Sequence, residues 1–323
     1  MELFVIGGTG YIGSVVCERL LADGHALRGL ARSDTAAALL SQAGVEPVRG
    51  AMGDADIIGK ESAAADGVVQ IATGGFLVQA LETVNEATST TNAVLDALAG
   101  TAKPYIYTAG TGGWLDTGLA FPDRVVTEAD PATPPHFYVH LHEILTKAVN
   151  SDDVWTIVAA PGQLYGRSGG YIGPIARMFN DVRKHGVVHA VNYDNAVTFV
   201  HVDDLADLYA LVLQTPSASG LYFAATDTVP ALEVARAVSV AAGLDGEVEM
   251  VDHLTMRALN GRANELDFFA NCRASSQRAI NELGWHPHRP GVIEELTSLP
   301  KPLDLHSVYP EPKRQAAAAR ATF

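Results

Sequence analysis

The sequence contains few cysteines and few basic residues. Only Cys17 and Cys272 occur among 323 residues. Their wide separation argues against a disulfide framework and favours buried thiols in a reducing compartment, so we expect a cytoplasmic protein. Lysine and arginine number 22 against 37 acidic residues, which gives a formal net charge of −15. This charge would repel nucleic-acid phosphates and anionic membranes, and we expect neither as a partner.

Long apolar runs are also missing. No stretch approaches the 18 or so apolar residues that a membrane-spanning helix needs, and the N-terminus reads as a strand rather than a signal peptide. Yet 48% of the residues are hydrophobic and only 18% are charged. This composition predicts a large core in one composite unit or two domains, and residues 306–323 read as a C-terminal tail.

Short apolar runs alternate with longer helical patterns through the first half of the chain. Strict alternation predicts parallel strands joined by right-handed helical crossovers, and hence an α/β fold with a Rossmann-type doubly wound sheet. Glycines just beyond three of the helical segments, Gly24, Gly44 and Gly100, suit left-handed helix ends. The predicted strands are 3–6, 26–30, 68–71, 105–107 and 155–159, and the helices are 12–22, 35–42, 85–98 and 138–149.

A glycine-rich turn follows the first strand. It reads Gly7-Gly8-Thr9-Gly10-Tyr11-Ile12-Gly13, with GxxGxxG spacing, and opens a helix. Glycines there permit a tight turn, close approach of the backbone to a pyrophosphate, and packing of the helix on its strand. The helix N-terminus supplies amide groups for phosphates. The turn therefore predicts a dinucleotide site, with Gly7, Gly10, Tyr11, Ile12 and Gly13 as cofactor contacts.

The end of the second strand indicates which dinucleotide is bound. An NAD enzyme usually carries an acidic residue there for the ribose 2′-hydroxyl. This sequence has Arg32 and Ser33, which suit a 2′-phosphate because a guanidinium pairs with phosphate and a hydroxyl adds a donor. We therefore predict NADP(H), while Asp34 leaves NAD(H) open.

The chain changes character after Pro161. Glycines crowd residues 162–173, and the segments that follow read as helix 175–184, strand 197–200, helix 203–213 and strand 221–224. We expect both strands to return to the main sheet, and helices 231–242, 275–283 and 292–299 to form a smaller, mostly helical cap. The predicted dinucleotide-binding domain is 1–160 and 197–225, and the predicted substrate-binding cap is 161–196 and 226–305.

Further motifs resemble the extended short-chain dehydrogenase/reductase family, the NAD-dependent epimerase/dehydratase-like group. The resemblance runs from Phe4 to about Leu299 and implies an NAD(P)-dependent oxidoreductase. It implies cofactor contacts by Met52, Ala72, Thr73, Pro161 and Leu164. The motifs are 49–54 (like GDLxD, with Ala51 replacing the adenine-side Asp), 70–72 (like HLA), 160–166 (like RPxxVYG, with Ala160 replacing Arg), 199–204 (like FVHVDD) and 283–287 (like LGWxP).

The catalytic positions depart from the family pattern. The family's catalytic Ser or Thr falls on Gly110, so Thr111 is the nearest hydroxyl that could polarise a substrate carbonyl. The Tyr-xxx-Lys pair falls on Tyr138 and His142, although counting back from the next strand places it about three residues earlier. A histidine is only partly charged near neutrality, so it would assist the tyrosine less than lysine does. The alternative is an ordinary amphipathic helix face.

The candidate substrate contacts follow the strand ends and are largely aromatic, which favours a medium-sized organic carbonyl compound over a nucleotide sugar. Core packing is an equally good interpretation of Tyr165, and the Asp203-Asp204 pair reads as a helix start. The histidines near 140 lack companion ligands, so we predict no metal site. The candidate contacts are Phe76, Trp114, Gln163, Tyr165, Arg167 and Tyr171.

The sequence thus favours an NADPH-dependent reductase of a ketone, aldehyde or imine. The enzyme alternative is an NAD-dependent sugar epimerase or dehydratase. The non-enzyme alternative is a catalytically degraded dinucleotide-binding regulator, and a homodimer stays open.

Overall fold

The computed structural model describes residues 1–73, 81–114, 123–134, 139–167, 173–191, 195–260 and 271–299, without the side chains of 81–83 and 260. Its centre is a sheet of seven strands in the order β11-β7-β5-β4-β1-β2-β3, and every neighbouring pair is parallel. The order reverses between β1 and β4, the position at which open α/β sheets bind ligands. In sheet order the strands are Gly220–Ala224, Val154–Pro161, Thr101–Thr108, Gly67–Gln70, Glu2–Ile6, Ala26–Ala31 and Glu46–Arg49.

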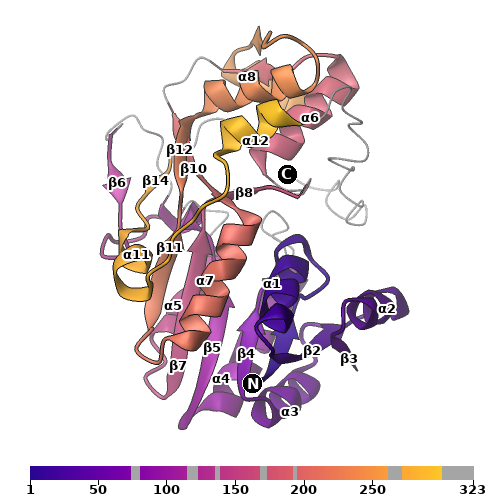
Figure 1. Ribbon diagram of the computed structural model, residues 1–323, viewed down its shortest axis with the longest axis vertical. Coiled ribbons are helices and arrows are strands. Elements are labelled where there is room, and N and C mark those ends of the chain that lie inside the picture. Colours follow the sequence, from indigo (N-terminus) through magenta and orange to yellow (C-terminus); the bar gives the residue numbers. More distant parts are fainter. Residues whose placement is uncertain are drawn as a thin grey trace.

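Helices cover both faces of this sheet, which confirms the predicted doubly wound α/β fold (Figure 1). One face is covered by α1 (Tyr11–Ala22), α2 (Asp34–Gln42) and α7 (Val202–Gln214). The other is covered by α3 (Ala55–Ala64), α4 (Leu81–Leu98) and α5 (Val139–Val149). The described helices include none long and apolar enough to cross a membrane.

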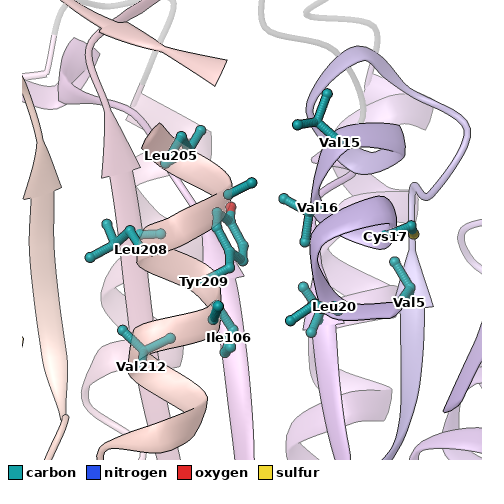
Figure 2. Close-up of a cluster of buried hydrophobic side chains, with 14 of the residues drawn as sticks. Val5, Val15, Val16, Cys17, Leu20, Ile106, Leu205, Leu208, Tyr209 and Val212 are labelled. Atoms are coloured by element: carbon teal, nitrogen blue, oxygen red, sulfur yellow. The ribbon is translucent and has the colours of Figure 1, made fainter. Parts of the chain in front are cut away.

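The apolar runs of the strands supply both cores because successive side chains of a strand point to opposite faces. In β1, Leu3 and Val5 pack with α1 and α7, whereas Phe4 and Ile6 pack with α3, α4 and α5. Figure 2 shows α1 and α7 side by side, with Val5 of β1 next to Cys17 of α1. A strand buried on both faces needs a continuous apolar run, which is the pattern in the sequence.

Three helices end at the predicted glycines. Gly24, Gly44 and Gly100 have φ angles of +83°, +82° and +69°. Only glycine adopts this left-handed conformation without a steric penalty from Cβ, so these positions end α1, α2 and α4 as expected.

A second unit of structure packs at the carboxyl end of the main sheet and forms the cap (Figure 1). Its sheet has the order β12-β10-β8, and its core includes Tyr165, Phe179 and Phe199. The cap elements are β8 (Gln163–Tyr165), α6 (Pro174–His185), β9 (His189–Ala190), β10 (Ala196–His201), β12 (Asp227–Pro230), α8 (Ala231–Ala241), β13 (Glu249–Met250), α9 (His253–Asn260) and α12 (Val292–Ser298).

The expectation that strand 197–200 rejoins the main sheet is wrong. This strand is β10, which pairs with β8 and with β12, whereas β11 does join the main sheet beside β7. The cause lies at Gly162, where the chain leaves β7 and approaches β10 closely. A Cβ on Gly162 would lie 2.4 Å from the Thr198 carbonyl oxygen.

Several short elements were not predicted. Strand β3 contains Pro47 and lies at the sheet edge, where a missing amide donor is tolerated. Helix α3 contains Gly59 and small residues with weak periodicity. The remaining described elements are β6 (Val125–Val126), β14 (Arg273–Ala274) and α11 (Gln277–Leu283). Helix α11 is the predicted helix 275–283, but its assignment to the cap is wrong, because it packs against β11 and α7 of the main sheet.

The close approach at Gly162 predicts a stability effect. Gly162→Ala forces the two backbones apart, so we expect the free energy of unfolding in urea to fall by about 1–3 kcal/mol. The control is Gly59→Ala in α3, where the nearest atom to a new Cβ is 3.8 Å away. This change should stabilise the protein by about 0.5–1 kcal/mol. Equal unfolding free energies for the two variants would contradict the packing at Gly162.

Candidate dinucleotide and catalytic site

The glycine-rich turn between β1 and α1 is built by three close contacts. Gly7 has a φ of +101°, and a Cβ there would lie 2.7 Å from the Ala72 amide nitrogen. A Cβ on Gly13 would lie 2.0 Å from the Gly7 carbonyl oxygen, so α1 can pack on the turn only with glycine at this position. The Gly10 amide donates to the same oxygen at 3.1 Å. Gly7 and Gly13 are therefore required by the fold itself.

Gly10 differs from these two glycines. It is the N-cap of α1 in an extended conformation, and among the described residues a Cβ there would meet only the Gly7 carbonyl oxygen within 4 Å, at 3.3 Å. The first turn of a helix carries amides without intrahelical partners. The backbone beside Gly10 therefore leaves room for a phosphate at the helix N-terminus, which fits a dinucleotide pyrophosphate.

The turn is also attached to the chain that follows β8. The Tyr11 hydroxyl donates to the Gly166 carbonyl oxygen at 2.6 Å. Arg167 reaches Glu18 of α1 at 2.6 and 3.1 Å and Asp203 of α7 at 2.6 Å. The bond to Glu18, followed by that to Asp203, raises the pKa of Arg167. Arg167, predicted as a substrate contact, therefore holds this segment against both helices.

The carboxyl end of β2 presents charged residues. Ser33 is the N-cap of α2, and its Oγ accepts the Ala36 amide at 3.1 Å. Arg32 is exposed and makes no ion pair within the part of the chain that the structure describes. Asp34 pairs with Arg49 of β3 at 2.8 Å. The predicted adenosine end of the site thus offers a guanidinium that has no carboxylate partner among the described residues.

The segment around Met52 is fixed by local hydrogen bonds. The Ala51 amide donates to Asp54 Oδ2 at 2.6 Å, and the Gly53 amide donates to Thr90 Oγ1 of α4 at 3.1 Å. Met52 is half-buried and packs against the core on the α4 face. The adenine contact of Met52 stays a prediction.

Buried polar groups support the end of β4. The Gln70 Oε1 atom accepts the Tyr105 hydroxyl at 2.6 Å, and its Nε2 donates to Thr91 Oγ1 at 3.2 Å and to the Ala72 carbonyl at 3.4 Å. Ala72 is the residue that Gly7 approaches, so two predicted cofactor positions come together here. Thr73 follows and is half-buried.

Hydroxyl groups near the end of β5 are buried. Thr108 lies 2.5 Å from the Tyr209 hydroxyl of α7, as expected for a residue buried at the strand end. Thr111 lies in the short 3-10 helix η1 (Thr111–Trp114) and is only 6% exposed. A substrate carbonyl could therefore reach Thr111 only over a small surface.

His142 of α5 packs against an aromatic cluster. Its ring lies 5.9 Å from the Trp114 ring, which in turn lies 4.9 Å from Phe223. Burial lowers the pKa of the His142 imidazole below its ordinary value of 6.5. Its buried Nδ1 has no hydrogen-bond partner among the described residues. The imidazole is therefore mostly neutral at pH 7, so it replaces the charge of the family's lysine even less than the sequence indicated.

Two predicted substrate contacts are packed in the core. Trp114 is 5% exposed, and its Nε1 donates to the Asp130 carbonyl at 3.0 Å. Tyr165 is 1% exposed, packs on Phe199 and His201, and donates to the Pro290 carbonyl at 2.8 Å. Both side chains therefore have packing roles in place of the predicted substrate contact, because their rings are covered and their polar atoms are already bonded.

Three of the remaining predicted residues lie at the end of β7 or in β8. Pro161 ends β7, while Gln163 and Leu164 of β8 are half-buried. Ile12 is half-buried in the first turn of α1. Tyr138, Phe76 and Tyr171 lie outside the described residues. The sequence did not single out Arg49, whose place beside Asp34 depends on the pairing of β2 with β3.

The Rossmann-type sheet, with the glycine-rich turn at its switch point, defines a dinucleotide-binding α/β protein. The model of the NAD dependent epimerase/dehydratase family matches residues 3–222, and the chain belongs to this family. Its members are NAD(P)-dependent enzymes.

Full-length relatives include uncharacterised proteins of two yeasts. The protein from Schizosaccharomyces pombe is 31% identical, over 92% of this chain and 99% of its own. The one from Saccharomyces cerevisiae is 27% identical, over 92% and 98%.

Solved structures share the fold at low identity. The human epimerase family protein SDR39U1 with NADPH has 18% identity and a TM-score of 0.68, over 92% of this chain and 98% of its own. The UDP-glucose 4-epimerase of Thermotoga maritima with UDP-glucose has 16% identity and a TM-score of 0.74, over 92% and 96%.

The open surface at Gly10 leads to a binding prediction. Gly10→Val would fill the space that a pyrophosphate needs, so titration should detect no NADPH or NADH binding at concentrations that saturate the parent protein. The melting temperature should stay close to that of the parent, because Gly7 is the only described residue within 4 Å of the new side chain's Cβ. Normal cofactor binding by this variant would show that the site lies elsewhere.

Proposed function

We propose that the protein is an NADP(H)-dependent reductase of a medium-sized organic ketone, aldehyde or imine. The observation that carries the proposal is the exposed Arg32 at the end of β2, without an ion pair in the described structure. A guanidinium at this position favours a 2′-phosphate, whereas an acidic side chain would favour a 2′-hydroxyl.

The residues around the glycine-rich turn have separate roles in this proposal. The backbone of the turn and α1 binds the pyrophosphate, while Arg32 and Ser33 bind the 2′-phosphate. Met52, Ala72 and Thr73 border the adenosine half, and Pro161 and Leu164 border the nicotinamide half. When bound, NADPH supplies the hydride. The turn contributes Gly7, Gly10, Tyr11, Ile12 and Gly13.

Proton donation is assigned to Tyr138, with His142 as its partner and Thr111 as an orienting hydroxyl. A phenol has a pKa near 10, and a neighbouring cation would make it a stronger acid. Because burial lowers the pKa of His142, that cation is largely absent at pH 7. A weakly assisted phenol favours substrates that need little proton donation, such as an imine that is already protonated. Gln163, with Phe76 and Tyr171, would contact the substrate.

A catalytically degraded dinucleotide-binding regulator is the second candidate. The lowered pKa of His142 favours it, as does Gly110 at the family's hydroxyl position. A screen separates the candidates: NADPH oxidation is measured against a panel of ketones, aldehydes and imines, and cofactor released from the purified protein is identified. Turnover of a carbonyl or imine supports the reductase. Cofactor binding without turnover favours the regulator, and retained NAD favours an epimerase.

Cofactor preference is tested at Arg32. Because the guanidinium is exposed, we expect Arg32→Ala to weaken NADPH binding roughly 10-fold, at the lower end for a charge-assisted hydrogen bond. NADH affinity should change less than about 2-fold, since NADH has no 2′-phosphate for Arg32 to contact. The control is Lys60→Ala, which removes an exposed positive charge from α3 and should change neither affinity. Equal losses for both cofactors at Arg32 would exclude the 2′-phosphate role.

The assignment of the proton donor is tested with Tyr138→Phe and His142→Lys. Losing a general acid typically costs 100-fold or more, so Tyr138→Phe should lower kcat by roughly that factor while cofactor affinity changes far less. Below its lowered pKa His142 is charged and assists the phenol, and this assistance is lost as pH rises. His142→Lys should therefore raise kcat most at pH 7–8, where the parent imidazole is neutral.

The matched control is His140→Lys, which adds the same charge at an exposed position of α5. It should leave the pH profile of kcat unchanged. A parent-level rate for Tyr138→Phe would mean that the proton comes from water or from the substrate. A His142→Lys profile identical to that of His140→Lys would remove His142 from the mechanism.

A further inference from the structure

Strands β2 and β3 end side by side at the adenosine end of the site. Ala31 is paired in register with Arg49, so both chains leave the sheet at the same level. From there the Arg49 guanidinium reaches Asp34 in the first turn of α2, with 2.8 Å between Nη2 and Oδ1. Arg32 lies between Ala31 and Asp34 in the sequence. Two cations and one carboxylate therefore gather where β2 ends.

The ion pair between Arg49 and Asp34 is open to water. The Arg49 side chain is 55% exposed, and the Asp34 side chain is fully exposed. Exposed pairs of this kind are held weakly, because water screens the charges and both side chains lose freedom on pairing. Either residue can therefore exchange its partner for a ligand at little cost to the fold.

Arg32 and Ser33 together do not neutralise the charge of a 2′-phosphate. The Ser33 Oγ accepts the Ala36 amide and keeps its proton for one hydrogen bond to a phosphate, but the hydroxyl carries no charge. A ribose 2′-phosphate carries close to two negative charges at neutral pH, and a single exposed guanidinium would leave it partly unneutralised. Arg49 is a second described cation at this end of the sheet, and it is paired with Asp34.

We infer that Arg49 is a second cation for the 2′-phosphate and that Asp34 opposes phosphate binding as its internal counter-ion. This inference rests on the proposed preference for NADP(H). With a 2′-phosphate, Arg49 leaves Asp34 for a group of higher charge that accepts two parallel hydrogen bonds. With a 2′-hydroxyl, Arg49 stays paired with Asp34, and the hydroxyl donates a hydrogen bond to the Asp34 carboxylate.

The two residues therefore act in opposite directions. Arg49 favours NADP(H) over NAD(H). Asp34 disfavours NADP(H), because it occupies the guanidinium and repels the phosphate, and the balance between them sets how strongly the protein discriminates. Because the Asp34 carboxylate lowers the affinity for NADP(H), the protein can still bind NAD(H).

The test measures ligand binding and needs no turnover. The full-length protein is titrated by calorimetry with 2′,5′-ADP and with 5′-AMP, which differ only in the 2′-phosphate. Arg49→Ala should weaken 2′,5′-ADP about 5- to 20-fold, a reduced effect for an exposed charge-assisted contact, and change 5′-AMP less than about 2-fold. Asp34→Asn should tighten 2′,5′-ADP by roughly 3- to 10-fold, with 5′-AMP unchanged or weaker.

Two controls carry the same charge changes away from the site. Glu46→Gln alters the opposite end of β3, and Lys60→Ala alters the exposed face of α3. Both should bind the two probes as the parent does. Equal effects of Arg49→Ala on both probes, no effect on either, or weaker binding of 2′,5′-ADP by Asp34→Asn would overturn the inference.

The same titrations separate this inference from the proposed function. A parent protein that binds 2′,5′-ADP no more tightly than 5′-AMP would contradict the NADP(H) preference and remove the basis for Arg49. A parent that favours 2′,5′-ADP and loses the preference in Arg32→Ala, but not in Arg49→Ala, would overturn only the role of Arg49.

Discussion

The contact between Gly13 and Gly7 is the constraint on which the site depends. With only 2.0 Å between the Gly7 carbonyl oxygen and the position of a Cβ on Gly13, α1 begins directly on the turn after β1. The helix then packs Val16, Cys17 and Leu20 into the core shared with α7 (Figure 2). This position brings the N-terminus of α1 to the carboxyl end of the sheet, at the switch between β1 and β4. A large apolar core therefore fixes the direction in which the helix amides point.

The cap is attached to this same helix. Tyr11 bonds to Gly166, and Arg167 bonds to Glu18 of α1 and Asp203 of α7. The next residue, Asp204, is 1% exposed and accepts the His288 and Arg289 amides at 3.1 and 3.2 Å, so α7 also holds the chain that leads into α12. These carboxylates begin α7, as the sequence indicated, and they additionally join the two parts of the molecule.

The sequence predicted the parts of the fold that repeat local rules. The continuous apolar run of β1, which is buried on both faces, and the glycines at 24, 44 and 100 follow from strand and helix geometry alone. The sheet that contains β10 could not be predicted, because an apolar run does not reveal which strand it pairs with. Trp114 and Tyr165 were predicted as substrate contacts because they follow strand ends, with core packing as an equally good interpretation of Tyr165. Only the packing shows that both rings are covered. The Arg49–Asp34 pair depends on strand register, and the lowered pKa of His142 depends on burial against Trp114.

The central claim is that this family member selects a dinucleotide through positive charge at the end of β2. It is tested most directly by the dissociation constants of NADPH and NADH for the unmodified protein at low and at physiological salt. The account predicts tighter binding of NADPH, with an advantage that shrinks as salt screens the exposed arginines. Equal dissociation constants at both salt concentrations, or tighter binding of NADH, would contradict it.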